Sequence, residues 1–163
     1  MLSYKKELLI SKEENIYINK YTPEPSEDKH IHDFFELVYT KSGECIHYID
    51  DTKYVTHHGD LVFISCGQTH SFEASAGTKL VNILITPEFI SSELIDAESI
   101  ITLFRHSMFT EFEISALPYQ CIHFEGAELN ETDSVIDMLI REYNAKEPGY
   151  KSVMQGGVRI LFS

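Results

Sequence analysis

Hydrophobic and polar residues alternate in short runs from about residue 7 to residue 124. Gly, Pro, Asp and Ser interrupt these runs, and alternation with a period of two is typical of strands that bury one face. Ser42-Gly43 and Asp50-Asp51 are suited to tight turns between such strands. The pattern predicts a mainly β, antiparallel barrel or sandwich, with strands at Asn15–Tyr21, Phe34–Lys41, Cys45–Ile49, Tyr54–His57, Asp60–Ser65, Lys79–Thr86 and Tyr119–Phe124.

The spacing of apolar residues changes toward the end of the chain, where they recur at three- and four-residue intervals. This spacing predicts a helix over Glu128–Asn144 that ends before Pro148-Gly149. A second helix is expected over Tyr150–Phe162, although Gly156-Gly157 weakens that expectation because glycine is a poor helix former. The apolar residues of Pro87–Phe109 fit one or two short helices packed against the barrel.

The length of 163 residues suits one domain with one ordinary core. We expect residues 1–125 to form the barrel, with an N-terminal arm at residues 1–14. Residues 126–163 would form a helical segment of the same domain. An amphipathic helix that follows a completed barrel often needs a partner surface, so we expect a homodimer through these helices.

Charge and cysteine usage exclude several classes of protein. The net charge of −13 opposes direct contact with nucleic acid or an anionic membrane. Cys45, Cys66 and Cys121 show no paired spacing of the kind that disulfide frameworks or thiolate zinc sites use. The sequence shows no signal peptide, and no apolar run approaches the roughly 18 residues of a membrane span. We therefore expect a cytoplasmic protein.

Four side chains with metal-binding chemistry stand out in the barrel region. In an extended strand alternate side chains share a face, which would place His30, His32 and Glu36 on one wall. His70 follows the turn Ser65-Cys66-Gly67-Gln68-Thr69, and that turn can bring the next strand beside them. Imidazoles with one carboxylate suit Fe, Mn, Ni, Zn or Cu and leave coordination positions open.

These residues also carry a resemblance to the cupin superfamily. His30, His32, Glu36 and Gly43 stand at the spacing of the first cupin motif. Gly59, Gly67 and His70 resemble the second motif, with Ser65 in place of the usual Pro and Ala74 in place of the usual Asn. The resemblance implies a cupin-type, jelly-roll-like barrel in which His30, His32, Glu36 and His70 form a metal-binding quartet.

A narrower resemblance covers about residues 14–90. His-x-His-Asp-Phe-Phe-Glu-Leu-Val-Tyr, Gly59-Asp60-Leu61-Val62-Phe63-Ile64 and Gly67-Gln68-Thr69-His70-Ser71-Phe72 look like the N-terminal sensor domain of AraC-type transcription regulators. It implies a small-molecule effector, dimerisation through the terminal helices and DNA binding by a helix-turn-helix domain that this sequence lacks. Because the chain ends on apolar residues without a helix stop signal, we expect it to be a piece of a longer regulator.

Other side chains are candidate contacts of the effector. Phe34, Val38 and Thr40 have the same parity as Glu36 and are expected to line the pocket. Phe63 is expected there too, although the alternate set Val62 and Ile64 fits equally well. His47 shares a face with Cys45 and Ile49, and the sequence leaves open whether that face is the lumen.

Three functions remain open at this point. The first is effector sensing, with a metal at His30, His32, Glu36 and His70 or with these residues bonded to one another instead. The second is a small metal-dependent cupin enzyme, such as a dioxygenase or isomerase. The absence of Arg before Arg105 argues against it, since an anionic substrate would lack a bidentate partner in the barrel. The third is a structural dimerisation domain with a vestigial pocket.

Overall fold

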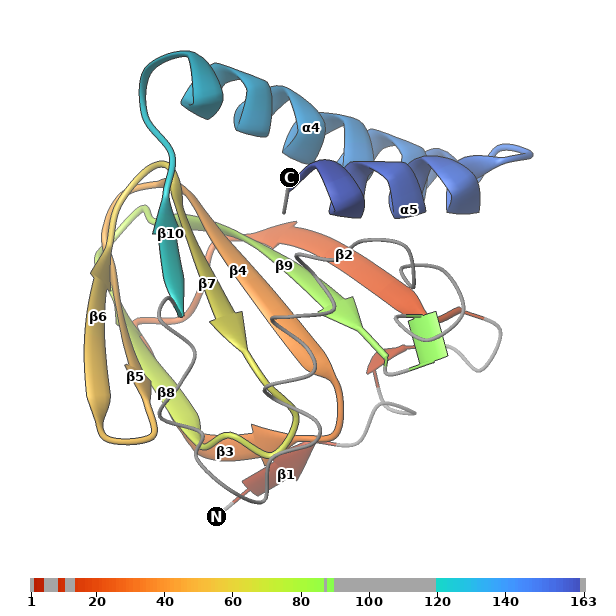
Figure 1. The fold of residues 1–163 in the computed structure, drawn as a ribbon. Helices are drawn as coiled ribbons and strands as arrows, with labels where there is room; N and C mark the ends of the chain where they lie inside the picture. The colour runs from red at the N-terminus through yellow and green to blue at the C-terminus, as the bar shows by residue number, and fades with distance from the viewer. Residues whose placement is uncertain (1, 5–8, 11–13, 87, 90–119, 162–163) are drawn as a thin grey trace.

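Two antiparallel sheets face each other in the computed structural model, which describes residues 2–4, 9–10, 14–86, 88–89 and 120–161 (Figure 1). Sheet A has the strand order β1-β3-β8-β5-β6, and sheet B has the order β10-β7-β4-β9-β2. Only β1 and β3 pair in parallel among the described strands. The strands are β1 Leu2–Tyr4, β2 Ile16–Tyr21, β3 Ser26–His32, β4 Phe35–Ser42, β5 Cys45–Ile49, β6 Thr52–Thr56, β7 Asp60–Ile64, β8 His70–Ala74, β9 Lys79–Ile85 and β10 Cys121–His123.

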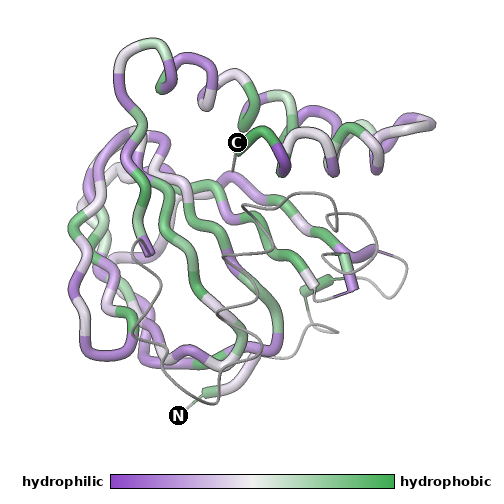
Figure 2. The backbone as a smooth tube through the Cα atoms, in the orientation of Figure 1, coloured by the Kyte–Doolittle hydropathy of each residue, from purple (hydrophilic) through white to green (hydrophobic). Residues whose placement is uncertain are grey.

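Sheet B separates two hydrophobic cores. Between the sheets, Val38, Val62 and Leu80 of sheet B pack with Ile49 and Phe72 of sheet A. The opposite face of sheet B is also buried, under the two helices. Because both faces are covered, β4, β7 and β9 are hydrophobic along most of their length, as Figure 2 shows, instead of alternating with polar residues.

Helices α4 (Gly126–Ala145) and α5 (Tyr150–Ile160) form a hairpin over the outer face of sheet B (Figure 1). Ile136, Leu139, Met154 and Val158 belong to the same buried cluster as the outward side chains of the sheet. No helix among the described residues is long and apolar enough to cross a membrane.

The predicted mainly β fold with two terminal helices is confirmed, with boundaries that differ by a few residues. Strand β1 was not predicted. The bounds of β3 and β8 were not predicted either, although extended chain was expected at His30 to Glu36 and a strand was expected after the turn before His70. The predicted helices of 87–109 fall outside the described residues, except that residues 88 and 89 are helical. Gly156-Gly157 does not break α5, since both residues lie inside that helix.

Asp133 fastens α4 to the barrel. Its carboxylate accepts hydrogen bonds from the Tyr39 hydroxyl at 2.8 Å, from Lys41 Nζ at 3.0 Å and from His58 Nε2 at 2.9 Å. These donors lower the pKa of Asp133, although partial burial alone would raise it. The polar contacts fix the N-terminal half of α4 over β4 and the turn before β7.

Replacing Asp133 by alanine is expected to destabilise the protein by about 1–3 kcal/mol, because Tyr39 and Lys41 lose a charged partner in a partly buried place. Urea unfolding measures the difference. Asp137→Ala is the matched control one turn further along α4, since Asp137 also pairs with Lys41 but is 52% exposed. That variant should lose less than about 1 kcal/mol. Equal losses in the two variants would contradict the anchoring role of Asp133.

A second polar contact joins the other end of the helical hairpin to the segment before β2. Glu14 accepts hydrogen bonds from the Tyr143 and Tyr150 hydroxyl groups, each at 2.9 Å, and from Lys146 Nζ at 2.6 Å. Nearby, Ile10 packs with Phe34 at the edge of the barrel. The N-terminal part of the chain therefore contacts both the barrel mouth and the helices.

Candidate ligand and metal site

The predicted metal-binding residues converge between the sheets, but from two walls. His30 and His32 lie on β3, and His70 lies directly opposite His30 on the adjacent strand β8 of sheet A. Glu36 lies on β4 of sheet B. The chain turns between β3 and β4, so the expectation that His32 and Glu36 share one face of one strand is wrong. They meet because that turn carries the chain across the lumen.

Three of the four residues form a compact, buried group. Candidate ligand atoms of His32, Glu36 and His70 lie within 4.8 Å of one another. Glu36 Oε2 lies 3.3 Å from His32 Nε2 and 3.6 Å from His70 Nε2. His30 lies beside this group, with its ring centroid 4.0 Å from that of His70, and its Nδ1 lies 2.8 Å from the Asp28 carbonyl oxygen.

The hydrogen bond of His32 determines which of its nitrogens carries a proton. His32 Nδ1 lies 2.6 Å from the Phe34 carbonyl oxygen, which can only accept, so Nδ1 donates. In the neutral ring Nε2 then carries a lone pair that faces the Glu36 carboxylate. His32 Nε2 and His70 Nε2 are both buried without a hydrogen-bond partner among the described residues. A lone pair and a carboxylate that face each other in a buried place require a cation between them, either a proton or a metal ion.

The pKa values of this group follow from burial and mutual charge. Burial alone would raise the pKa of Glu36, but the imidazole rings of His32, His70 and His30 around the carboxylate hold this pKa below its ordinary value. Burial lowers the pKa of His70 to about 3. The group therefore presents a carboxylate and a neutral His70 near pH 7, which is the protonation state that a divalent metal needs in its ligands.

Asn82 is a part of the site that the sequence analysis missed. Its amide Nδ2 donates to Glu36 Oε1, and its Oδ1 accepts from the Tyr21 hydroxyl at 3.3 Å. Asn82 lies on β9 opposite Val38 of β4, so its side chain reaches the lumen from the neighbouring strand. An asparagine inside the apolar run Leu80 to Ile85 was the signal that could have identified it.

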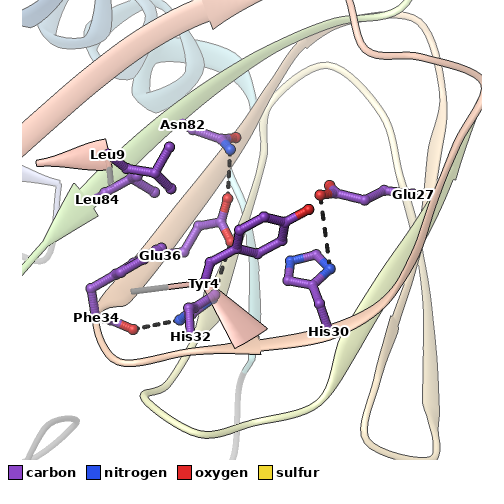
Figure 3. A pocket seen from close by; sticks show the side chains of 9 residues that line it. All are labelled: Tyr4, Leu9, Glu27, His30, His32, Phe34, Glu36, Asn82 and Leu84. Carbon is purple, nitrogen blue, oxygen red and sulfur yellow. Dashed lines mark hydrogen bonds and ion pairs between the residues drawn. The ribbon is translucent and has the colours of Figure 1, made fainter. Parts of the chain in front are cut away.

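Four residues of this group, His30, His32, Glu36 and Asn82, open onto a cavity of about 210 Å³ (Figure 3). Tyr4 and Leu9 of the N-terminal segment line one side, and the ring of Tyr4 meets His30 edge to face at 4.9 Å. No Lys or Arg is among the described residues that line the cavity, which are Tyr4, Leu9, Glu27, His30, His32, Phe34, Glu36, Asn82 and Leu84. The cavity is therefore rich in hydrogen-bond acceptors and aromatic surface, without a fixed positive charge.

The structure brings only one of the five predicted effector contacts to this cavity. Phe34 lines it and stacks on His32 at 4.2 Å. Val38 lies in the core between the sheets, and Thr40 donates a hydrogen bond to Thr56 there. Phe63 lies on the opposite face of sheet B, in the cluster under the helices. Both faces of β7 are apolar and buried, so the alternation could not decide between Phe63 and its neighbours.

His47 lies deeper between the sheets, opposite Phe72, and its Nε2 is buried without a hydrogen-bond partner among the described residues. Burial lowers the pKa of His47 to about 4 from an ordinary value of 6.5. The folded protein therefore favours neutral His47, and the free energy of unfolding is highest with respect to this residue above pH 6.5. It falls as the pH decreases from about 6.5 toward about 4, because the unfolded chain binds a proton at His47 more readily than the folded chain.

Because of His47, the parent is expected to lose free energy of unfolding on the order of 3 kcal/mol as the pH falls from about 6.5 to about 4. We expect His47→Leu to lack this loss. At pH 7 the variant should be at least as stable as the parent, since the substitution removes an unpaired buried polar atom. Urea unfolding across this pH range measures the effect. An unchanged pH profile would show that His47 titrates normally in the folded protein.

The fold is a cupin-type barrel of two facing sheets with a cavity between them. Residues 16–110 match the family of the AraC-like ligand binding domain, and the chain belongs to this family. The HTH-type transcriptional activator RhaR of Salmonella arizonae is 24% identical over 148 residues, covering 91% of this chain and 49% of that protein. The protein of the same name from Pectobacterium carotovorum is 39% identical over 62 residues, or 38% of this chain and 22% of that protein.

One solved structure supports the arrangement of barrel and helices. Apo ToxT from Vibrio cholerae matches with a TM-score of 0.58 over 91% of this chain and 55% of that one, at 12% sequence identity. This likeness concerns the fold alone. The chain spans about half of the length, or less, of the curated relatives described above.

Proposed function

We propose that this chain binds a small-molecule effector as the sensing part of a bacterial, cytoplasmic transcription regulator. The observation that carries the proposal is the cavity of Figure 3, lined on one side by Tyr4 and Leu9, in a chain of the AraC-like ligand binding family. A ligand that contacts both β3 and Tyr4 favours the state in which Tyr4 packs against His30. Such a ligand shifts the equilibrium between two states of the protein without catalysis. The size of the shift depends on how much more tightly the ligand binds one state than the other.

The lining of the cavity favours an uncharged, polyhydroxylated effector such as a sugar. Glu27 and Glu36 accept hydrogen bonds from hydroxyl groups, while the rings of Tyr4 and Phe34 offer flat apolar surfaces. A phosphate or carboxylate group would meet two carboxylates and no Lys or Arg among the described lining residues. Phe34 is the effector contact we retain at the cavity, and His47 is a candidate beneath it.

The same residues fit a divalent transition metal. His32, Glu36 and His70 would hold the ion, and His30 is the further candidate ligand beside them. Fe, Mn, Ni, Zn and Cu all accept imidazole and carboxylate ligands, and the unpaired Nε2 atoms of His32 and His70 are the observation that supports such an ion. When bound, the ion would supply a positive centre for an oxygen atom of the effector.

The buried group of His32, Glu36 and His70 also favours one alternative, a metal-dependent cupin enzyme such as a dioxygenase or isomerase. Two curated relatives described above are named transcriptional activators, which supports sensing instead. We further propose that residues 126–163 form a homodimer surface and that DNA is contacted by a domain outside this chain.

Thermal melting with a panel of ligands separates these functions. Protein purified without a nickel column is first analysed for metal and then melted with neutral sugars, polyols and their phosphorylated or carboxylated counterparts. The sensor proposal expects neutral polyols to raise the melting temperature, and expects Asn82→Leu to abolish that rise by removing a partner of Glu36. Stoichiometric metal together with turnover of a substrate, and no stabilising ligand in the panel, would support the enzyme.

A further inference from the structure

The turn between β7 and β8 holds the position of His70. It spans Ser65 to Thr69 and joins sheet B to sheet A directly before His70. The Gly67 N–H donates to the His32 carbonyl oxygen at 2.8 Å, so the turn also contacts the backbone of the second histidine. A displacement of this turn therefore changes how His32 and His70 face Glu36.

The Gln68 side chain is the central element of this turn. It is buried, with 7% of its surface exposed, and its Oε1 accepts the Ser65 N–H at 2.8 Å. Its Nε2 donates to Asp50 Oδ2 at 3.0 Å. Asp50 in turn accepts the Thr69 N–H at 3.1 Å and donates its own N–H to the Thr69 carbonyl oxygen at 2.7 Å. The residues on both sides of Gln68 are thus held by its amide and by Asp50.

Gln120 connects this network to the strand that leads into the helices. Its Nε2 donates to Gln68 Oε1 at 3.0 Å, and its Oε1 accepts the Tyr54 hydroxyl at 3.1 Å. The Gln120 carbonyl oxygen accepts the Phe63 N–H at 2.9 Å, at the start of β10. Strand β10 pairs with β7 from Val62 to Asp60 and leads into the N-terminus of α4 (Figure 1).

We propose that Gln68 is a positioning residue of the ligand site, which fixes His70 against Glu36 and joins this geometry to β10 and α4 through Gln120. Gln68 is not among the residues that line the cavity and acts through His70 and the turn. The inference rests on the proposed function, since it assigns a role in binding at the same pocket. It predicts that metal affinity depends on a matched hydrogen-bond donor and acceptor at positions 68 and 50, and that a glutamine at position 68 is not itself required.

A double substitution tests that pattern. In Gln68→Glu a carboxylate faces Asp50 across 3.0 Å, so the turn loses a hydrogen bond and gains a like-charge contact. We expect cobalt(II) to bind about 10-fold more weakly, with an altered visible spectrum. Adding Asp50→Asn restores a donor toward position 68 and keeps an acceptor for Thr69. Asparagine also tolerates the positive φ of 51° at position 50. The double variant should recover the parent affinity and spectrum.

A control of similar burial lies at the other end of the barrel. Thr78→Val removes the hydrogen bonds of the Thr78 hydroxyl to the Glu44 backbone, and Thr78 is fully buried. This variant should melt at a lower temperature with unchanged cobalt affinity and spectrum. If Gln68→Glu behaves in the same way, Gln68 is structural only and the proposal is overturned.

A metal-free readout keeps the two proposals separate. In the apo protein, NMR signals of the His32 and His70 rings should shift in Gln68→Glu, return in the double variant and stay in place in Thr78→Val. A parent protein that fails to bind cobalt would refute the metal proposal, while the ring signals would still decide the role of Gln68. If Gln68→Glu does not fold, Gln120→Met replaces it: the substitution removes the side-chain hydrogen bonds of Gln120 to Gln68 and Tyr54, and the His32 and His70 ring signals should shift relative to those of the parent. Unmoved ring signals in Gln120→Met would overturn the link to β10.

Discussion

Glu36→Gln is expected to weaken divalent metal binding by more than about 100-fold. The substitution removes the negative charge that lies 3.3 Å and 3.6 Å from the Nε2 atoms of His32 and His70. A glutamine amide would also direct either a weaker acceptor or a donor at the place of the ion. Titration with cobalt(II), followed by visible absorption and by calorimetry, measures the loss.

Glu27→Gln is the matched control, because it makes the same chemical change in the wall of the same cavity. Glu27 is 37% exposed and lies 3.8 Å from His30 Nδ1, apart from the group of His32, Glu36 and His70. We expect a change in affinity of less than about 5-fold, as is usual for a screened charge outside the coordinating set. A parent protein without cobalt affinity, or equal losses in the two variants, would refute the metal proposal.

Gly157→Val is expected to destabilise the protein by about 1–3 kcal/mol, the usual range for overpacking a core. A Cβ atom at position 157 would lie 2.5 Å from Leu139 Cδ2 and 3.0 Å from Leu139 Cγ. Leu139 is fully buried in the cluster that the two helices share with sheet B. Either its side chain must leave its present position in this core or the two helices must separate to admit the new side chain.

The neighbouring glycine provides the comparison. A Cβ atom at position 156 would meet no heavy atom within 4 Å. Gly156→Val is therefore expected to leave the free energy of unfolding unchanged or to raise it by less than about 1 kcal/mol, since valine is the better helix former. Urea unfolding of both variants measures the difference. If Gly157→Val were as stable as Gly156→Val, the close contact between α4 and α5 would not be a determinant of stability.

The strands that the sequence predicted are mainly those that bury apolar residues. In β2, β4, β7 and β9 the hydrophobic pattern reflects burial directly. The extent of β3 was not predicted, because its first residues are polar and mostly exposed and only His30 and His32 in it are buried. Its backbone is held by pairing with β8 and β1, which are contacts that no local pattern reveals.

The candidate site was predicted through motif spacing, which located His30, His32, Glu36 and His70. The spacing could not show that these residues come from two sheets, since that depends on the turn between β3 and β4. Asn82 reaches the pocket from β9, and its place inside an apolar run was the only local sign of it. Tyr4 reaches the pocket from β1, and nothing in its local sequence specifies that approach. Which set of β7 side chains faces the lumen was undetermined because both sets are apolar.

The burial of sheet B on both faces has a consequence for how its strands find their partners. A slip by one residue normally exposes an apolar row to water, and this penalty fixes the pairing. In β4 and β9 a slip would only exchange one apolar row for another. Glu36, Thr40 and Asn82 interrupt the inner row with polar groups that find their partners in a single alignment. The side chains that form and support the pocket therefore also help to select the correct strand alignment during folding.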